Sequence, residues 1–214
     1  MPMMTSPQVL LTLSLMLALS AQVGRATTPH IEQRSDEPVL VLTTAMEAAL
    51  RAFDPEFKVR RIYDYPPTMW RRGCTWSLDC ARALYTLKPR EAPFAVIGDF
   101  NGDGIEDVVM DGDNAKTGRR IVLLSSGRSF SATEVEVIAR ADHQVVRDQK
   151  GADRGWESGL DVGLSLATPA TYRTPYEPQP LALTTDGFVV NFFEKASVLF
   201  YLRNGKWNKF VLSD

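Results

Sequence analysis

The sequence has little of the usual metal and redox chemistry, with only two cysteines and two histidines in 214 residues. Structural zinc sites take four ligands from Cys and His, and His30, Cys74, Cys80 and His143 show no zinc-ligand spacing. No Cys-x-x-Cys pair, glycine-rich phosphate loop or His-Glu-x-x-His motif is present. The sequence therefore lacks the signatures of thiol redox, phosphoryl-transfer and zinc-protease chemistry.

Neither sign of charge predominates, because 24 Lys and Arg residues face 26 Asp and Glu residues, for a net charge of −2. This balance does not favour binding to nucleic acid or to an anionic membrane. Basic residues cluster mainly in one set of four arginines: Arg60, Arg61, Arg71 and Arg72. A solvent-exposed strand face is a better interpretation of this cluster than an anion-binding site.

Long apolar runs are also absent beyond the N-terminal segment, where Val9 to Ala18 has the length of a signal-peptide core. Small residues follow at Ala21, Gly24 and Ala26, so we expect residues 1–26 to be a signal peptide and the protein to be exported, periplasmic or extracellular. No Lys or Arg precedes the apolar run, and a membrane anchor or a buried N-terminal helix is the alternative.

The chain is rich in oxygen ligands at one place, the segment from Asp99 to Asp107. Calcium takes six to eight oxygen ligands. Side-chain or carbonyl oxygens fall at alternate positions of this segment, and Gly104 stands where such a loop turns sharply. The spacing predicts a Ca²⁺ site with five ligands from the chain: Asp99, Asn101, Asp103, the carbonyl of Ile105, and Asp107.

The residues on either side of this loop identify its type. Phe94 to Ile97 and Val108 to Met110 are short, apolar and rich in β-branched residues, which indicates strands. An EF-hand would have helices there and a glutamate in place of Met110. The motif Gly98-Asp-Phe-Asn-Gly-Asp-Gly-Ile-Glu-Asp107 resembles the FG-GAP/VCBS repeat family. The resemblance implies Ca²⁺ at the matched positions; it covers residues 94–126 in a single copy, so it does not imply the propeller that several such repeats build.

Two short helices are expected before the sheet. Thr44-Ala-Met-Glu47 has the form of a capping box and predicts a helix that ends at Asp54-Pro55. In an exported protein Cys74 and Cys80 predict a disulfide, which requires a second helix to begin between them, over residues 78–87.

The rest of the chain favours an α+β fold. We expect residues 27–38 to be a flexible leader, because they are polar and lack periodicity, and residues 39–214 to form a single domain. Residues 140–158 suggest a long surface excursion, and the four prolines in 168–180 suggest a stiff loop. Asp186-Gly187 and Asn204-Gly205 predict tight hairpin turns. The expected fold is a mostly antiparallel β-sheet with two short N-terminal helices and one Ca²⁺-binding strand–loop–strand unit.

Two classes of function agree with these features. The first is an exported, non-enzymatic calcium-binding module whose loop is rigidified by Ca²⁺ and whose surface binds a protein or a glycan. The second is a small secreted or periplasmic hydrolase with a scattered site. The first is favoured because the one concentrated set of functional residues in the sequence is the set of calcium ligands. For a hydrolase, His143 as a general base has no assignable nucleophile. Glu106 and Asp113 could be imagined as an acid/base pair, but their charge is better explained by the nearby cation. The four tryptophans are better explained as core than as a sugar platform.

Overall fold

The computed structural model describes residues 27–34, 37–65, 88–138, 143–147, 153–158, 162–192 and 195–214. Over these residues the protein is mostly antiparallel β-sheet with one short α-helix, and every strand pairing is antiparallel. The elements are β1 (His30–Arg34), β2 (Glu37–Val41), α1 (Thr44–Phe53), β3 (Lys58–Val59), a 3₁₀ turn (Ile62–Asp64), β4 (Glu91–Ala92), β5 (Ala95–Gly98), β6 (Asp107–Asp113), β7 (Gly118–Ser126), β8 (Ser129–Ile138), β9 (His143–Arg147), β10 (Asp153–Ser158), β11 (Val162–Ala167), β12 (Ala170–Tyr172), β13 (Leu181–Leu183), β14 (Gly187–Phe192), β15 (Ser197–Arg203) and β16 (Lys206–Ser213).

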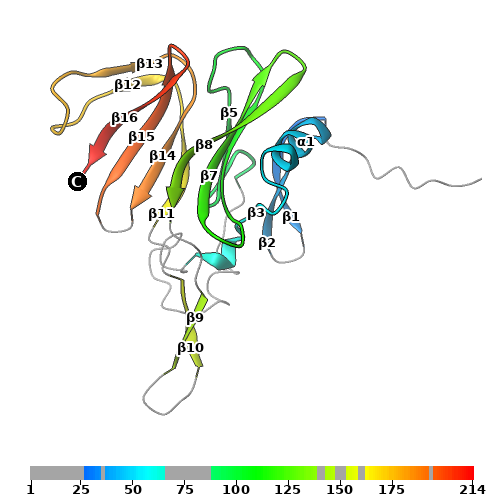
Figure 1. The fold of residues 1–214 in the computed structure, drawn as a ribbon. Helices are drawn as coiled ribbons and strands as arrows, with labels where there is room; N and C mark the ends of the chain where they lie inside the picture. Colours follow the sequence, from blue (N-terminus) through cyan, green and yellow to red (C-terminus); the bar gives the residue numbers. More distant parts are fainter. Residues whose placement is uncertain are drawn as a thin grey trace, which may run out of the picture.

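Two sheets make up the body of the molecule (Figure 1). The first sheet has the order β4-β5-β6-β7-β8, with β3 pairing to the end of β6, and the second has the order β11-β14-β15-β16. The sheets adjoin along β4 and β11, where the Leu164 N–H donates to Pro93 O at 2.9 Å and the Leu166 N–H donates to Glu91 Oε2 at 2.7 Å. The pairs β1–β2, β9–β10 and β12–β13 are separate two-stranded units.

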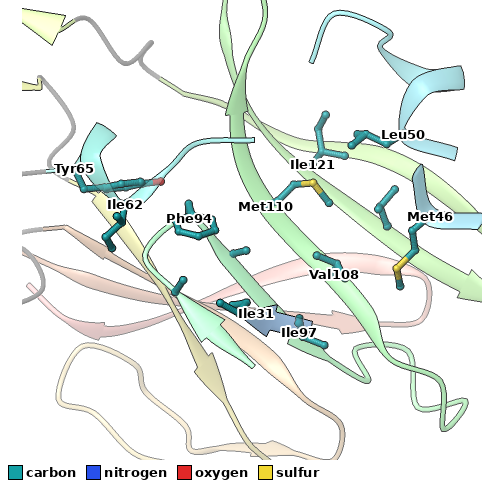
Figure 2. Packing of buried hydrophobic residues seen from close by; sticks show 13 residues of the cluster. Ile31, Met46, Leu50, Ile62, Tyr65, Phe94, Ile97, Val108, Met110 and Ile121 are labelled. Atoms are coloured by element: carbon teal, nitrogen blue, oxygen red, sulfur yellow. The ribbon is translucent and has the colours of Figure 1, made fainter. Parts of the chain in front are cut away.

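The central strands β5, β6 and β7 are buried on both faces: successive side chains of a strand point to opposite sides, and nearly all of theirs are buried. On β6, Val108 and Met110 face α1 and the β1–β2 pair, whereas Val109 faces the second sheet. Figure 2 shows the core on the α1 side, where Met46 and Leu50 of the helix meet the strands. The core between the sheets has these fully or nearly buried members: Val96, Phe100, Val109, Val122, Leu164, Phe188, Val190 and Phe200.

The N-terminal part differs from the sequence expectation at two points. The expected leader 27–38 instead contains β1 and the start of β2, because Ile31 is buried in the core under α1 and its N–H donates to Pro89 O at 3.0 Å. The helix ends at Phe53 as expected, but Thr43 is its N-cap, and the Thr43 Oγ1 accepts the Met46 N–H at 3.2 Å. The cap therefore lies one residue before the box that the sequence predicts over Thr44 to Glu47.

Two other segments also depart from the interpretation of the sequence, and a third is more regular than expected. Arg60 is not on a solvated strand face: it is buried and forms two hydrogen bonds with Asp113, at 2.9 and 3.0 Å. The expected excursion 140–158 contains the paired strands β9 and β10. Asp186-Gly187 is not a hairpin turn, because β13 pairs with β12 while β14 pairs with β11 and β15. Asp186 instead contacts the acidic loop of the candidate site.

Several expectations are confirmed. Asn204 and Gly205, with φ of 53° and 71°, form the tight turn between β15 and β16. The strands expected on both sides of the acidic loop are β5 and β6. The expected helix 78–87, the disulfide Cys74–Cys80 and the signal peptide 1–26 lie outside the described residues.

Candidate metal site

The acidic loop connects β5 to β6 at one end of the first sheet, as a strand–loop–strand unit. Gly98 and Asp107 are cross-strand partners, so the loop starts and ends at the same point of the sheet. Phe100 anchors it from within: the ring is fully buried and packs edge-on against Phe188 and Trp207, with 6.0 Å between ring centroids in each case. The loop is therefore attached to the core between the two sheets.

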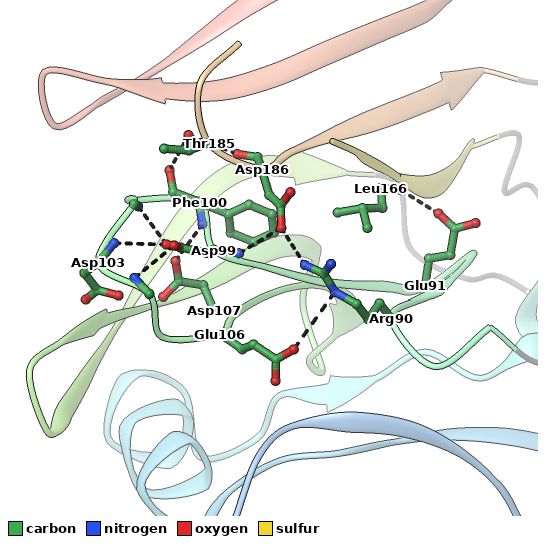
Figure 3. A network of polar contacts seen from close by, with 12 residues as sticks. Arg90, Glu91, Asp99, Phe100, Asp103, Glu106, Asp107, Leu166, Thr185 and Asp186 are labelled. Carbon is green, nitrogen blue, oxygen red and sulfur yellow. Dashed lines mark hydrogen bonds and ion pairs between the residues drawn. The ribbon is translucent and has the colours of Figure 1, made fainter. Parts of the chain in front are cut away.

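The loop backbone wraps around the carboxylate of Asp99. Its Oδ1 accepts the N–H groups of Gly102 at 2.7 Å and Asp103 at 3.1 Å, and its Oδ2 accepts the N–H of Gly104 at 2.9 Å. Gly104 has φ of 82° with open space around it, so the left-handed turn itself is what requires glycine there. Figure 3 shows the three N–H groups converging on Asp99.

Asn101 and Asp103 are tied to Ser125, which is on β7. The Asn101 Nδ2 donates to Ser125 O at 2.9 Å, and the Ser125 hydroxyl donates to Asp103 Oδ2 at 2.8 Å. The Asp103 Oδ1 accepts the Ile105 N–H at 2.9 Å. Desolvation acts to raise the pKa of Asp103, but hydrogen bonds from Ser125, Ile105 and Asn101 outweigh it and lower the pKa of this exposed residue below its ordinary value.

Asp107 is fully buried, and each of its carboxylate oxygens accepts a backbone N–H. Its Oδ2 accepts from Phe100 at 2.9 Å and its Oδ1 accepts from Ser125 at 2.7 Å. Burial raises the pKa of Asp107, while these hydrogen bonds act against the rise. The residue thus joins the loop to β7, a role that its position in the motif does not reveal.

A second set of contacts comes from residues 184–186, between β13 and β14. The Asp186 Oδ2 accepts the Asp99 N–H at 3.1 Å and a hydrogen bond from the Arg90 Nη2, and the Thr185 hydroxyl donates to Phe100 O at 3.2 Å. Sequence reasoning missed Ser125 and Asp186 as neighbours of the loop, because each reaches it only through the pairing and packing of the sheets.

Three of the four carboxylates in the loop, those of Asp99, Asp103 and Asp107, have no cationic side chain beside them in the described part of the chain, whereas Glu106 lies 4.0 Å from Arg90. Four other aspartates each form an ion pair with an arginine: Asp54, Asp111, Asp113 and Asp186. Among the side chains that the structure describes, no Lys or Arg lies within ion-pair distance of Asp99, Asp103 or Asp107. Three carboxylates in one short loop without a cationic partner form an environment that attracts a hard cation.

The carboxylates do not converge, however. Over the described residues, no three His, Cys, Asp or Glu side chains form a group that could hold a metal ion. The expected ligand set also includes the Asn101 side chain and the Ile105 carbonyl, which belong to none of these four residue types. The donors fit Ca²⁺ in chemical kind, since all are oxygens, but the loop N–H groups and Ser125 occupy positions around them.

The other candidates from the sequence are not part of this loop. Asp113 is bound by Arg60, so it does not pair with Glu106 as an acid and base, and the Glu106 Oε1 lies 4.0 Å from the Arg90 Nε. The Trp207 ring is half-buried between the sheets, in agreement with a core role. His143 is on β9, where the structure describes the backbone alone.

Comparison with protein-family models, curated proteins and solved structures finds no match to this chain. The resemblance to FG-GAP/VCBS repeats therefore depends on the loop motif alone. Within the described ranges, α1 is too short to cross a membrane, and no other helix there has the length and apolar character to do so.

Proposed function

We propose that this protein is an exported calcium-binding β module with a structural or binding role, in which Ca²⁺ rigidifies the loop from Asp99 to Asp107. The observation that carries the proposal is that Asp99, Asp103 and Asp107 have no Lys or Arg at ion-pair distance among the described side chains, whereas four aspartates elsewhere in the fold pair with arginines. Export is proposed from the apolar segment of signal-peptide length at residues 9–18.

Five residues would hold the ion: Asp99, Asn101, Asp103, Ile105 through its carbonyl, and Asp107. Bound Ca²⁺ would supply positive charge that links oxygens from both ends of the loop. These oxygens now accept hydrogen bonds from loop N–H groups and from Ser125, so the ion competes with contacts that already exist. Such competition agrees with the weak affinity of extracellular calcium modules, about 10⁻⁴–10⁻³ M.

Calcium at about ten times its dissociation constant should raise the free energy of unfolding by about 1.4 kcal/mol, since it binds the folded state only. For a chain of this size the melting temperature should rise by about 3–6 °C. The measurement is thermal unfolding of the full protein with excess Ca²⁺ and with a chelator. Asp103→Asn should remove the rise, because it removes a charged ligand.

The matched control is Glu56→Gln, which makes the same acid-to-amide change at an exposed residue between α1 and β3. This variant should keep the full calcium effect. Equal melting temperatures of the wild-type protein with Ca²⁺ and with chelator would overturn the proposed function.

A further inference from the structure

The sequence contains two Asn-Gly pairs, Asn101-Gly102 and Asn204-Gly205. In such a pair the backbone nitrogen of glycine can attack the side-chain amide carbon of asparagine, because glycine has no side chain to hinder the approach. The attack needs an asparagine amide that is able to rotate and a glycine N–H that no acceptor holds. The two pairs should therefore differ in reactivity to the extent that the fold restrains these groups.

The fold restrains Asn101-Gly102 on both sides of the reacting bond. The Asn101 Nδ2 donates to the carbonyl of Ser125 at 2.9 Å and to its hydroxyl at 3.1 Å, and the Asn101 Oδ1 accepts the Asp103 N–H at 2.9 Å. The Gly102 N–H donates to Asp99 Oδ1 at 2.7 Å. Attack at this pair thus requires the loop to open first.

Asn204-Gly205 has none of these restraints. The pair forms the exposed turn between β15 and β16 (Figure 1), with φ of 53° and 71°. Within the part of the chain that the structure describes, neither the Asn204 side chain nor the Gly205 N–H forms a hydrogen bond. A Cβ atom added to Gly205 would meet no other atom within 4 Å, so the space around the glycine is open. Both reacting groups are therefore free in the folded protein.

We propose that Asn204 is a site of spontaneous deamidation in the folded protein, whereas the fold protects Asn101. The nitrogen of Gly205 forms a bond to Asn204 Cγ, the Cγ–Nδ2 bond breaks, and the proton of the attacking nitrogen leaves with Nδ2 as ammonia. Water then opens the cyclic imide at either carbonyl, which leaves aspartate or isoaspartate at position 204. The inference needs no Ca²⁺ and is independent of the proposed function.

The reaction changes both the charge and the length of the turn. Either product places a negative charge between Arg203 and Lys206, which are cross-strand partners. Isoaspartate also lengthens the main chain by one methylene group. The next pair along the hairpin is Leu202 with Trp207, whose ring packs against Phe188 at 5.3 Å between centroids. Because loop length selects the turn type of a hairpin, the isoaspartate form should be less stable than the aspartate form.

The test compares the two pairs in one sample. The full wild-type protein is incubated with chelator at mildly alkaline pH, and deamidation is followed by the mass of the peptides that contain residues 101 and 204. In the folded protein, residue 204 should react faster than residue 101 by about tenfold or more, because reaction at Asn101 waits for local opening of the loop. In concentrated urea the two rates should become similar.

Two variants identify the origin of the difference. Asn204→Gly removes the reactive amide, while a Gly-Gly pair still suits a two-residue turn with positive φ. Its turn peptide should gain no mass. Asp99→Ala removes the acceptor of the Gly102 N–H and should speed deamidation at Asn101 without changing the rate at Asn204.

Three results would overturn the inference. The first is deamidation of the folded wild-type protein at residue 101 as fast as at residue 204. The second is deamidation at neither residue within the time in which both react in urea. The third is an equal mass gain in the turn peptide of Asn204→Gly, since the change would then arise at another asparagine, such as Asn208. All three are measured without Ca²⁺, so the proposed function is tested separately.

Discussion

Asp111→Ala is expected to lower the free energy of unfolding by about 3–5 kcal/mol, because it leaves a buried arginine without its main partner. Asp111 on β6 and Arg120 on β7 are cross-strand partners, and both side chains are at most 1 % exposed. Two hydrogen bonds join them, from Arg120 Nε at 2.8 Å and from Nη2 at 2.9 Å. The pair lies on the face that carries Val109 and Val122, toward the second sheet.

The charge of Arg120 persists in this environment. Burial disfavours the guanidinium charge, but Asp111 and Glu136 outweigh it and raise the pKa of Arg120 above its ordinary value. Glu136 on β8 accepts the Arg120 Nη1 at 2.7 Å and also contacts Lys209 of β16 at 3.3 Å. Without Asp111, the partly exposed Glu136 would be the one carboxylate left in an ion pair with Arg120 among the described residues.

Urea denaturation with chelator present would measure the loss. The double variant Asp111→Leu/Arg120→Leu should recover most of it, since an apolar pair can replace a buried ion pair at little cost. Lys209→Ala is the control, because Lys209 also pairs with Glu136 but is exposed. It should lower the free energy of unfolding by less than about 1 kcal/mol. A cost below about 1 kcal/mol for Asp111→Ala would show that the pair does not stabilise the fold.

Asp107→Ala should produce a comparable loss, and it should do so even without calcium. Its carboxylate is the acceptor for the N–H groups of Phe100 and Ser125. Removing it leaves two donors unpaired at a buried site, at a cost of about 1–3 kcal/mol for each. Denaturant unfolding in chelator is the measurement.

Asp103→Asn provides the comparison within the same loop. Asp103 is exposed, so water can replace the lost contacts, and the variant should change stability in chelator by less than about 1 kcal/mol. The two aspartates are equivalent in the motif, yet only Asp107 is expected to matter without the ion. Equal losses for both variants in chelator would show that Asp107 has no special role in joining the loop to β7.

Local sequence signals predicted the parts of the fold that depend on neighbouring residues. Short runs of apolar, β-branched residues located β5 and β6, and Asn204-Gly205 located a hairpin turn because both residues tolerate positive φ. The same reasoning failed for Asp186-Gly187. That dipeptide suits a turn, but the chain passes there from β13 to a strand with other partners, and Asp186 binds the loop instead.

Burial also gave two residues roles that the sequence did not indicate. Arg60 looked like part of a basic surface, but Asp113 comes beside it when β3 pairs with β6, so the charge is buried as a pair. Ile31 looked like part of a polar leader, since one apolar residue among polar ones gives little periodicity. Its burial depends on the core under α1, which residues far along the chain complete.

The order of oxygen donors, the glycine at the sharp turn and the strands on either side of the loop were all determined by the sequence, because each depends on residues next to one another. Tertiary structure alone decided what surrounds the loop. Ser125 is 24 residues from Asn101 and Asp186 is 87 residues from Asp99, and pairing of β6 with β7 and packing of the two sheets bring them into contact. Hydrogen bonds between distant residues depend on which strands pair and in what register, and a local pattern does not contain that information.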